Sequence, residues 1–238
     1  MWLAVDTATD RASAALGTGA SDALEEEMEG ARRHAAALVP MLSRLLARRG
    51  VTLDAVTGLA LADGPGSFTG LRVGAAMMKA FARSRRLPLW TAPSLLVRAA
   101  GLAEEGRLVL AVADALRGDV YAGLYRFHAG RVETLLPAAV RRPGELVATA
   151  PVPDLLVGDG PTPIVQGLEA WAGRAMLRPP AGAPHARWLI GLTGVAGGAR
   201  PVEEVDGWQP EYGRPAEAQT RWETVHGRPL PDPIGAPR

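Results

Sequence analysis

The sequence predicts an α/β protein with two lobes. Short apolar runs at residues 2–5, 58–62 and 108–113 have β character, and each leads into an aspartate. Longer segments with helical periodicity alternate with these runs, which is typical of the α/β class. The polar stretch at 104–106 marks a linker between the two lobes.

The domain organisation follows from this linker and from the composition of the C-terminus. Residues 226–238 are rich in proline and poor in apolar side chains, so we expect a disordered tail there. The expected lobes are 1–104, completed by about 208–225, and 105–207.

The composition is that of an ordinary globular protein and names no partner. Hydrophobic residues make up 47% of the 238 residues, which is enough to bury a core. The 26 basic and 25 acidic side chains leave a formal charge of +1, so charge gives no overall drive toward nucleic acid. The absence of cysteine excludes disulfides, thiolate metal sites and a cysteine nucleophile.

The N-terminal residues, MWLAVDTATD, lack the basic region of a signal peptide. No apolar run is long enough to cross a bilayer. We therefore expect a cytoplasmic protein with no membrane contact.

The most informative stretch is DGPGSFTGLRVG at residues 63–74, which joins a strand to a helix over about 71–83. Ser67 or Thr69 can accept a hydrogen bond from the first helical N–H groups. A glycine-rich loop at a helix N-terminus can bind an anion, although plain turn chemistry is the commoner explanation. The loop is neither a Walker A motif nor a Rossmann fingerprint, because Gly70 is followed by Leu71 and Arg72 and no glycine stands at Thr69.

Two helices are expected in the first lobe. Residues 31–49 carry apolar side chains at three- and four-residue spacing, and residues 71–83 are apolar almost all round. The second helix is therefore either fully buried or covered on one face by a partner. His34 has no histidine one turn later, since Leu38 stands there, so we expect a capping or surface residue and no metal site.

Several aspartates and glycines follow predicted strands. Asp6-Thr7, Asp63, Asp114 and the Gly158-Asp159-Gly160 turn all lie where strand ends gather around a ligand in α/β folds. The same residues are also ordinary turn formers, so both readings remain open.

A resemblance adds to these patterns. The run GPGSFTGLRVGAAMMKAFA closely resembles the signature of the bacterial TsaB family, also called YeaZ, of tRNA threonylcarbamoyladenosine biosynthesis proteins. Other stretches agree in order: RRHAAALVPMLSRLL, in which Ala35 replaces the usual serine, the hairpin from Asp114 to Tyr121, in which Leu116 replaces an arginine, and the closing motif from Trp208 to Arg214. The resemblance spans roughly residues 2–225.

The resemblance implies an actin-like fold, shared with sugar kinases and Hsp70 and related to RNase H, in which each lobe is a mixed sheet of the five-stranded type with flanking helices. It also implies a scaffold subunit without chemistry of its own. Such a subunit activates TsaD, which places threonylcarbamoyl on adenosine 37 of tRNAs that read codons starting with A, with TsaE as a further partner. We expect a homodimer when TsaD is absent, tRNA contact only through the complex, and no cofactor required by this chain, with ATP or ADP possible in the complex.

The site residues implied by the resemblance fall into three sets, and none is catalytic or a metal ligand. The expected partner interface comprises Leu38, Met41, Leu42, Leu45, Val73, Met77, Ala80 and Phe81. The family-motif loop comprises Gly64, Pro65, Gly66, Ser67, Phe68, Thr69, Gly70 and Arg72. A degenerate nucleotide cleft would comprise Asp6, Thr7, Asp114, Arg117, Gly158, Asp159 and Gly160.

Three other functions are alternatives to the scaffold. An ATP-dependent kinase or transferase of the same superfamily would bind and turn over Mg-ATP. A tRNA-binding module would show a salt-dependent affinity of its own. A peptidase using Ser67 is disfavoured, because the loop is not a Gly-x-Ser-x-Gly elbow.

Overall fold

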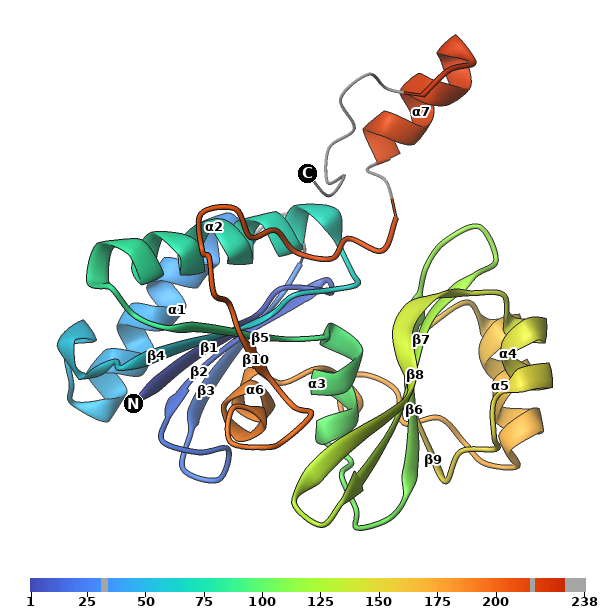
Figure 1. Ribbon diagram of the computed structural model, residues 1–238, viewed down its shortest axis with the longest axis horizontal. Helices are drawn as coiled ribbons and strands as arrows, with labels where there is room; N and C mark the ends of the chain where they lie inside the picture. Colours follow the sequence, from blue (N-terminus) through green and yellow to red (C-terminus); the bar gives the residue numbers. More distant parts are fainter. Residues whose placement is uncertain (31–33, 215–216, 230–238) are drawn as a thin grey trace.

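Two mixed β-sheets organise the chain, and helices cover their faces (Figure 1). The computed structural model describes residues 1–30, 34–214 and 217–229. Outside the described residues lie the start of the first predicted helix at 31–33, residues 215–216 of the segment expected to complete the first lobe, and most of the expected tail, 230–238.

The elements occur in the following order: β1 (Trp2–Asp6), β2 (Arg11–Gly17), β3 (Leu24–Glu29), α1 (His34–Arg49), a 3₁₀ turn (Leu53–Ala55), β4 (Gly58–Ala62), α2 (Phe68–Arg85), β5 (Leu89–Ala92), α3 (Ser94–Ala100), β6 (Leu108–Asp114), β7 (Val120–His128), β8 (Arg131–Arg141), α4 (Pro143–Thr149), β9 (Leu155–Gly158), α5 (Thr162–Ala172), α6 (Ala186–Leu192), β10 (Arg200–Pro201) and α7 (Glu217–His226).

The two sheets repeat one topology. In the first, with order β10-β5-β4-β1-β2-β3, β1 pairs antiparallel with β2 and parallel with β4. In the second, with order β8-β7-β6-β9, β6 pairs antiparallel with β7 and parallel with β9. In place of a fifth strand, the second sheet has an isolated parallel bridge between Val157 and Leu177. The predicted mixed sheets are confirmed, but they have six and four strands, because β10 extends the first sheet and the bridge at Leu177 does not grow into a strand.

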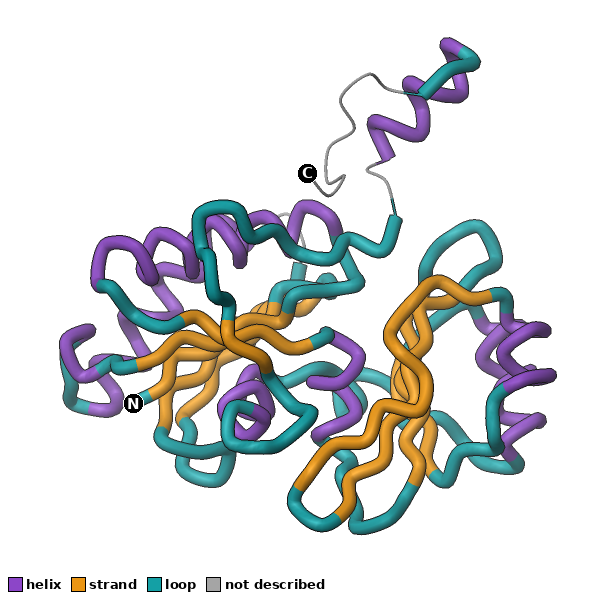
Figure 2. The backbone as a smooth tube through the Cα atoms, in the orientation of Figure 1, coloured by secondary structure: helices purple, strands orange, loops and turns teal. Residues whose placement is uncertain are grey.

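The layers follow from which residues each face buries. Leu3, Val5 and Leu59 of the first sheet pack under α1 and α2, while Ala4 and Ala60 face α3 and α6. The tube view shows the resulting order, with α3 and α6 between the two sheets and with α4 and α5 on the far side of the second sheet (Figure 2). Small alanine side chains on the inner face let the two helices approach the first sheet closely.

The segment after α5 returns to the first sheet. The helix α6 packs on β1 and β2, and β10 pairs with β5 through Arg200 and Thr91. The sequence placed these residues within 105–207, because nothing local distinguishes an apolar segment that packs on one sheet from one that packs on the other. Residues 208–214 then run along α2, and α7 projects away from both lobes (Figure 1).

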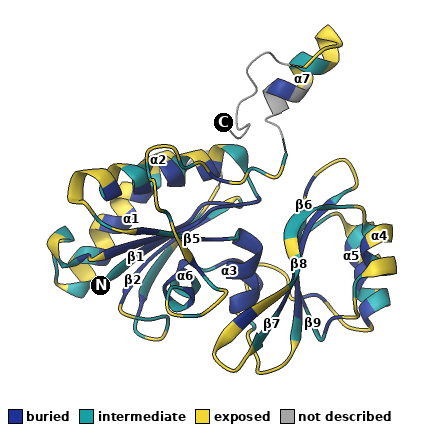
Figure 3. Cartoon of the chain, in the orientation of Figure 1, coloured by how far each residue is buried: buried dark blue, intermediate teal, exposed yellow. Residues whose placement is uncertain are grey.

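The face of α1 that was expected to contact a partner is the face that is buried in the core of this chain. Leu38, Met41, Leu42 and Leu45 are all buried in the core against the first sheet. Val39, between two of them, is 58% exposed. The burial colouring shows the same division along α1 and α2, with a buried side toward the sheet and an exposed side away from it (Figure 3). The four α1 residues therefore belong to the core of the chain and are not available to a partner.

The described part of the chain contains no helix that is both long and apolar enough to cross a membrane.

Adjacent residues of α1 provide a test of this packing. Leu38→Ala should lower the free energy of unfolding by about 2–5 kcal/mol, because it leaves a cavity in the core. Val39→Ala, one residue away, should change it by less than about 0.5 kcal/mol. Urea denaturation of both variants measures the difference, and equal losses would mean that α1 is rotated from the orientation described.

Candidate functional site

The family-motif loop connects β4 to α2 and lies directly against the turn that follows β1. The Ser67 N–H donates to the Ala8 carbonyl at 2.7 Å, and the Thr7 hydroxyl donates to the Gly70 carbonyl at 2.8 Å. Ser67 also caps α2, since its Oγ accepts the Gly70 N–H at 3.3 Å. The predicted capping is confirmed at Ser67.

Glycines make this close approach possible. A Cβ on Gly66 would lie 2.3 Å from the Ala8 carbonyl oxygen, and one on Gly70 would lie 2.0 Å from that of Thr7. Neither backbone oxygen can move without distorting the β1 turn. The loop therefore needs glycine at both positions for packing, which is a sufficient reason for them without a bound phosphate.

The loop also joins two more distant segments. Gly64 exchanges hydrogen bonds with Ser94 at the start of α3, and the Asp63 carbonyl accepts the Glu211 N–H at 2.7 Å. The Phe68 ring lies 4.5 Å from the Tyr212 ring, measured between centroids. The Arg72 guanidinium lies over the Phe68 ring, 5.6 Å from its centroid. Thr69 is exposed and Pro65 is buried.

These contacts decide how the loop can be used. The N–H groups of Gly64, Ser67, Gly70 and Leu71 all donate within the chain, so the loop does not present them to an anion. In the described residues no hydrogen bond joins Ser67 to a histidine, so the geometry of a serine nucleophile and its base is absent there. The loop is a packing centre in this structure.

His34 lies beside this loop and is buried, contrary to the expectation of a capping or surface residue. Its Nε2 is 3.3 Å from the Asp10 carbonyl oxygen, and its Nδ1 is a buried atom without a hydrogen-bond partner among the described residues. A Cβ on Gly70 would come within 3.3 Å of that Nδ1. The close packing of the loop accounts for the burial, which helical spacing alone could not reveal.

The predicted cleft residues separate into two groups. Asp159, after β9, accepts a hydrogen bond from Arg98 of α3, and the charge of Arg98 also acts on Asp6 at the end of β1; we call Asp6, Arg98, Val112 and Asp159 the lobe junction. Asp114 and Arg117 lie at the tip of the β6–β7 hairpin, where the Asp114 carboxylate accepts the Leu116 N–H. Both are exposed.

Gly158 and Gly160 have structural roles next to this junction. Gly158 has a φ of 145°, and a Cβ there would lie 2.0 Å from the Val112 carbonyl oxygen. Gly160 is half-buried near Val165 of α5. Gly158 of the predicted nucleotide turn thus allows β9 to approach β6, whereas a Cβ on Gly160 would make only an ordinary contact with Val165.

Burial perturbs two aspartates in the first lobe. It raises the pKa of Asp6 to about 6, although the Ala8 N–H and the Arg98 charge act in the opposite direction. It also raises the pKa of Asp63 to about 6, against the attraction of Arg200, whose Nη2 lies 2.9 Å from the carboxylate. Perturbed acids often mark functional sites, but Asp63 is explained by its burial beside a structural ion pair.

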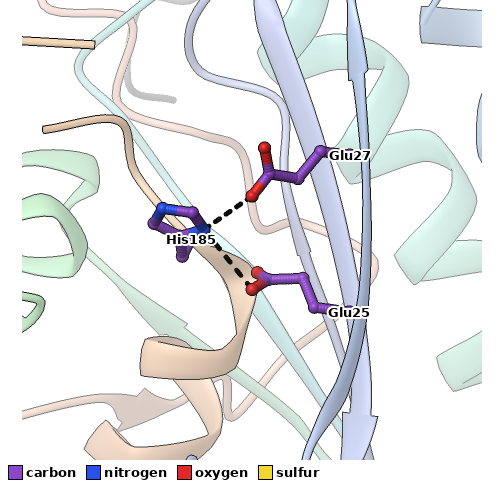
Figure 4. Close-up of side chains that lie close together, drawn as sticks. All are labelled: Glu25, Glu27 and His185. Atoms are coloured by element: carbon purple, nitrogen blue, oxygen red, sulfur yellow. Dashed lines mark ion pairs between the residues drawn. The ribbon is translucent and has the colours of Figure 1, made fainter. Parts of the chain in front are cut away.

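A further cluster was missed by the sequence analysis. Glu25 and Glu27 of β3 face His185, whose Nδ1 lies 3.4 Å and 2.7 Å from the two carboxylates (Figure 4). The ligand atoms of the three residues lie within 4.8 Å of one another, so they could hold a metal ion. The alternation Glu25-x-Glu27 on a strand was the available signal, because it places both side chains on one face.

The same cluster is already satisfied by ion pairs. The Arg187 side chain donates to Glu25 at 2.7 Å, and Arg11 lies 3.3 Å from Glu27. Hydrogen bonding to Glu25 raises the pKa of His185, which favours an imidazolium over a neutral metal ligand. The network joins the start of α6 to β3.

An open pocket of about 450 Å³ lies elsewhere, under the segment that follows β10. Thr91, Arg200, Glu203 and Trp208 are among its lining residues. It contains none of the predicted site residues.

The second predicted helix leaves part of its interface set exposed. Ala80 is exposed, and Val73, Met77 and Phe81 are half-buried at the edge of the core under α2. Together with the outward side of α1 they border a surface that we call the helix face, defined by Ala36, Val39, Pro40 and Ser43 of α1 and Ala76 and Ala80 of α2.

Comparison with known proteins places this geometry in a family. Residues 28–164, more than half of the chain, match the family model described as TsaD, tRNA N6-adenosine threonylcarbamoyltransferase. The solved structure of YeaZ from Pseudomonas aeruginosa superposes with a TM-score of 0.66 at 30% identity, covering 81% of this chain and 90% of that one. A second structure, an uncharacterized protein with similarity to peptidase YeaZ from the same organism, gives 0.72 at 29% identity over 90% of this chain and 99% of that one.

Curated relatives agree with the structures. The tRNA threonylcarbamoyladenosine biosynthesis protein TsaB of Escherichia coli is 34% identical over 126 residues, which cover 52% of this chain and 54% of the relative. TsaB of Haemophilus influenzae is 36% identical over 122 residues, 50% of this chain and 51% of the relative. The chain thus spans about half the length of these curated relatives in the matches.

The fold and the loop define an actin-like α/β protein of two lobes, as the sequence predicts. Within that class, the chain belongs to the TsaB family, also called YeaZ.

The packing of the motif loop gives a prediction at Gly70. Gly70→Ala should destabilise the fold by about 3 kcal/mol or more, because the new methyl group meets the Thr7 carbonyl oxygen at 2.0 Å. Gly167→Ala in α5 is the matched control: it meets nothing within 4 Å and should stabilise the protein by about 0.5–1 kcal/mol. Thermal unfolding of both variants distinguishes them, and a Gly70→Ala protein as stable as the wild type would refute the close contact.

Asp6 gives a pH prediction. Its pKa is about 6 in the folded chain and 3.8 in the reference state, so the folded state holds the proton more tightly. Stability should therefore be lost as the pH rises from about 4 to about 6, by about 3 kcal/mol for this group. Asp6→Asn should flatten that part of the curve of unfolding free energy against pH.

Asp22→Asn is a control for which the unfolding free energy should depend on pH with the opposite sign. The Gly19 N–H lowers the pKa of Asp22 to about 2, so its contribution is lost only when the pH falls below about 4. Parallel curves for the wild type and Asp6→Asn between pH 4 and 6 would contradict the burial of an ionisable Asp6.

Proposed function

We propose that this chain is a non-catalytic scaffold that binds and activates TsaD in forming threonylcarbamoyladenosine at position 37 of tRNA. The observation that carries the proposal is the helix face on a chain of the TsaB family, whose curated members are named for this pathway. TsaE joins the assembly, a second copy of the chain covers the helix face when TsaD is absent, and the complex acts in the cytoplasm.

The helix face has the properties of a docking surface. Val39 and Pro40 are exposed next to Ala36 and Ser43, and the side chains are small and uncharged. Ala76 and Ala80 continue this character on α2. Small side chains let a partner helix approach closely, and no charge has to be desolvated at the centre of the contact.

Charged residues border this surface. Arg44 and Arg48 share the carboxylate of Glu26, and Arg83 pairs with Asp206. An apolar centre with a polar rim is the usual anatomy of a specific interface.

The remainder of the molecule gives little support to an enzyme. The N–H groups of Gly64, Ser67, Gly70 and Leu71 donate within the chain, and one oxygen of Asp159 accepts from an arginine. An ATP-dependent transferase would need these groups for phosphate and for a divalent cation. On this proposal the chain requires no cofactor, and tRNA reaches it only within the complex.

Substitutions on the helix face test the proposal. Val39→Asp and Ala80→Asp should each weaken association with TsaD from the same organism by more than about 100-fold, because an unpaired charge becomes buried in the contact. Ala148→Asp, at an exposed alanine of α4 on the other lobe, should leave the affinity unchanged. Light scattering and isothermal titration of the purified proteins measure these effects.

The structure of the variants provides the necessary control. Val39 and Ala80 are exposed, so both variants should unfold within about 0.5 kcal/mol of the wild type. If the wild type forms no complex with TsaD and TsaE under conditions that support tRNA modification, the proposal is wrong. If the helix-face variants bind as tightly as the wild type, the docking surface lies elsewhere.

A further inference from the structure

The lobe junction contains a buried arginine that the sequence patterns did not single out. Arg98 lies on α3, between the two sheets, and its side chain is 2% exposed. Its Nη1 donates to the Val112 carbonyl of β6 at 2.5 Å, and its Nη2 donates to Oδ2 of Asp159 at 2.7 Å. One side chain that follows β5 of the first sheet thus bonds to the ends of two neighbouring strands of the second.

Asp6 completes the junction from the first sheet. It is fully buried, and its Oδ2 has no hydrogen-bond partner in the part of the chain that is described. The Arg98 charge acts on this carboxylate, and the charges of Glu25 and His185 have smaller effects on it. The guanidinium therefore bonds to the acidic group after β9 and acts through its charge on the one at the end of β1.

The fold class implies a bound metal ion and a nucleotide, but the residues of the lobe junction do not fit them. Acidic side chains at strand ends would have to hold the cation, but Asp159 already binds a fixed positive charge. The loop that would cradle phosphates uses the N–H groups of Ser67 and Gly70 internally. A divalent cation entering the junction would meet the guanidinium of Arg98 and be repelled.

We propose that Arg98 is the resident cation of the lobe junction: its charge takes the place of a metal ion at Asp159 and acts on Asp6, and its hydrogen bonds hold the two lobes together. Holding the two lobes together requires the guanidinium group, because its two nitrogen donors reach the Val112 carbonyl and the Asp159 carboxylate at the ends of two different strands. The exclusion of a metal requires only the charge. These two roles can be separated by substitution.

The experiment uses the full purified chain, with Arg98→Met, Arg98→Lys and Arg187→Met. Arg187 is a matched control, because its Nε–Glu25 bond is also 2.7 Å but joins α6 to β3 within the first lobe. Hydrogen exchange of α3, β6 and β9 reports the fastening. Electron paramagnetic resonance of added Mn²⁺, with and without ADP, reports the metal site.

Arg98→Met should lose both roles. Amides of α3 and of the strand ends should exchange about tenfold faster or more, since a charged hydrogen bond is removed. Mn²⁺ should bind at least about tenfold more tightly than to the wild type, because the repelling charge is gone. Asp159→Asn in the same background should abolish this gain, which separates the site from the cluster of Glu25, Glu27 and His185.

Arg98→Lys should separate the two roles. Because lysine keeps the positive charge, Mn²⁺ binding should stay at the wild-type level. Because lysine lacks the two donors of the guanidinium group, hydrogen exchange should become faster. Arg187→Met should change neither hydrogen exchange nor Mn²⁺ binding at the lobe junction.

Mn-ADP binding to the wild type that is lost on Asp159→Asn would overturn the proposal. Unchanged hydrogen exchange in both Arg98 variants would also overturn it. If Arg98→Met does not fold, Arg98→Lys and the wild type still decide. No measurement involves TsaD, so failure here leaves the docking proposal standing.

Discussion

The contact between the motif loop and the turn after β1 is the constraint on which the first lobe depends. Two glycines bring the loop within hydrogen-bonding distance of the Thr7 hydroxyl and the Ala8 carbonyl, where no side chain fits. The same loop starts α2, holds the beginning of α3 through Ser94 and accepts the returning chain at Glu211. The position of the helix face is therefore set by backbone contacts that leave no freedom at Gly66 and Gly70.

This constraint changes the meaning of a glycine-rich loop at a helix start. In a phosphate-binding loop the free N–H groups point at the ligand, but here they are consumed by Ala8, Ser94 and the capping serine. The lobe junction shows the same pattern, because Arg98 of this chain bonds to the Asp159 carboxylate, where an external ligand would otherwise bind. The loop contacts fix the first lobe, and the Arg98 bonds join the first lobe to the second. A protein that presents a surface requires such a fixed arrangement.

The sequence was informative where a signal is local. The strand, loop and helix around residues 58–85 follow from glycine and serine at fixed positions, and the antiparallel turn after β1 follows from Asp6-Thr7. The strand β3 gave no such signal, because its three consecutive glutamates are poor strand formers. In the structure they are balanced by Arg44, Arg187 and His185 from other elements, so the strand forms through tertiary pairing.

The sequence by itself determined the α/β class and the capped start of α2, since each rests on neighbouring residues. The glycine requirement of the loop came from the tertiary structure, because Gly70 meets Thr7, 63 positions away in the sequence. Only the tertiary structure decided which side of α1 is buried, because helical spacing groups Leu38 and Leu45 on one side without saying what covers it. Only the tertiary structure also brought Arg98 to Asp159, which lies 61 positions further along the chain. The reason is the same in both cases: burial and ion pairing are properties of surfaces that meet after the chain has folded.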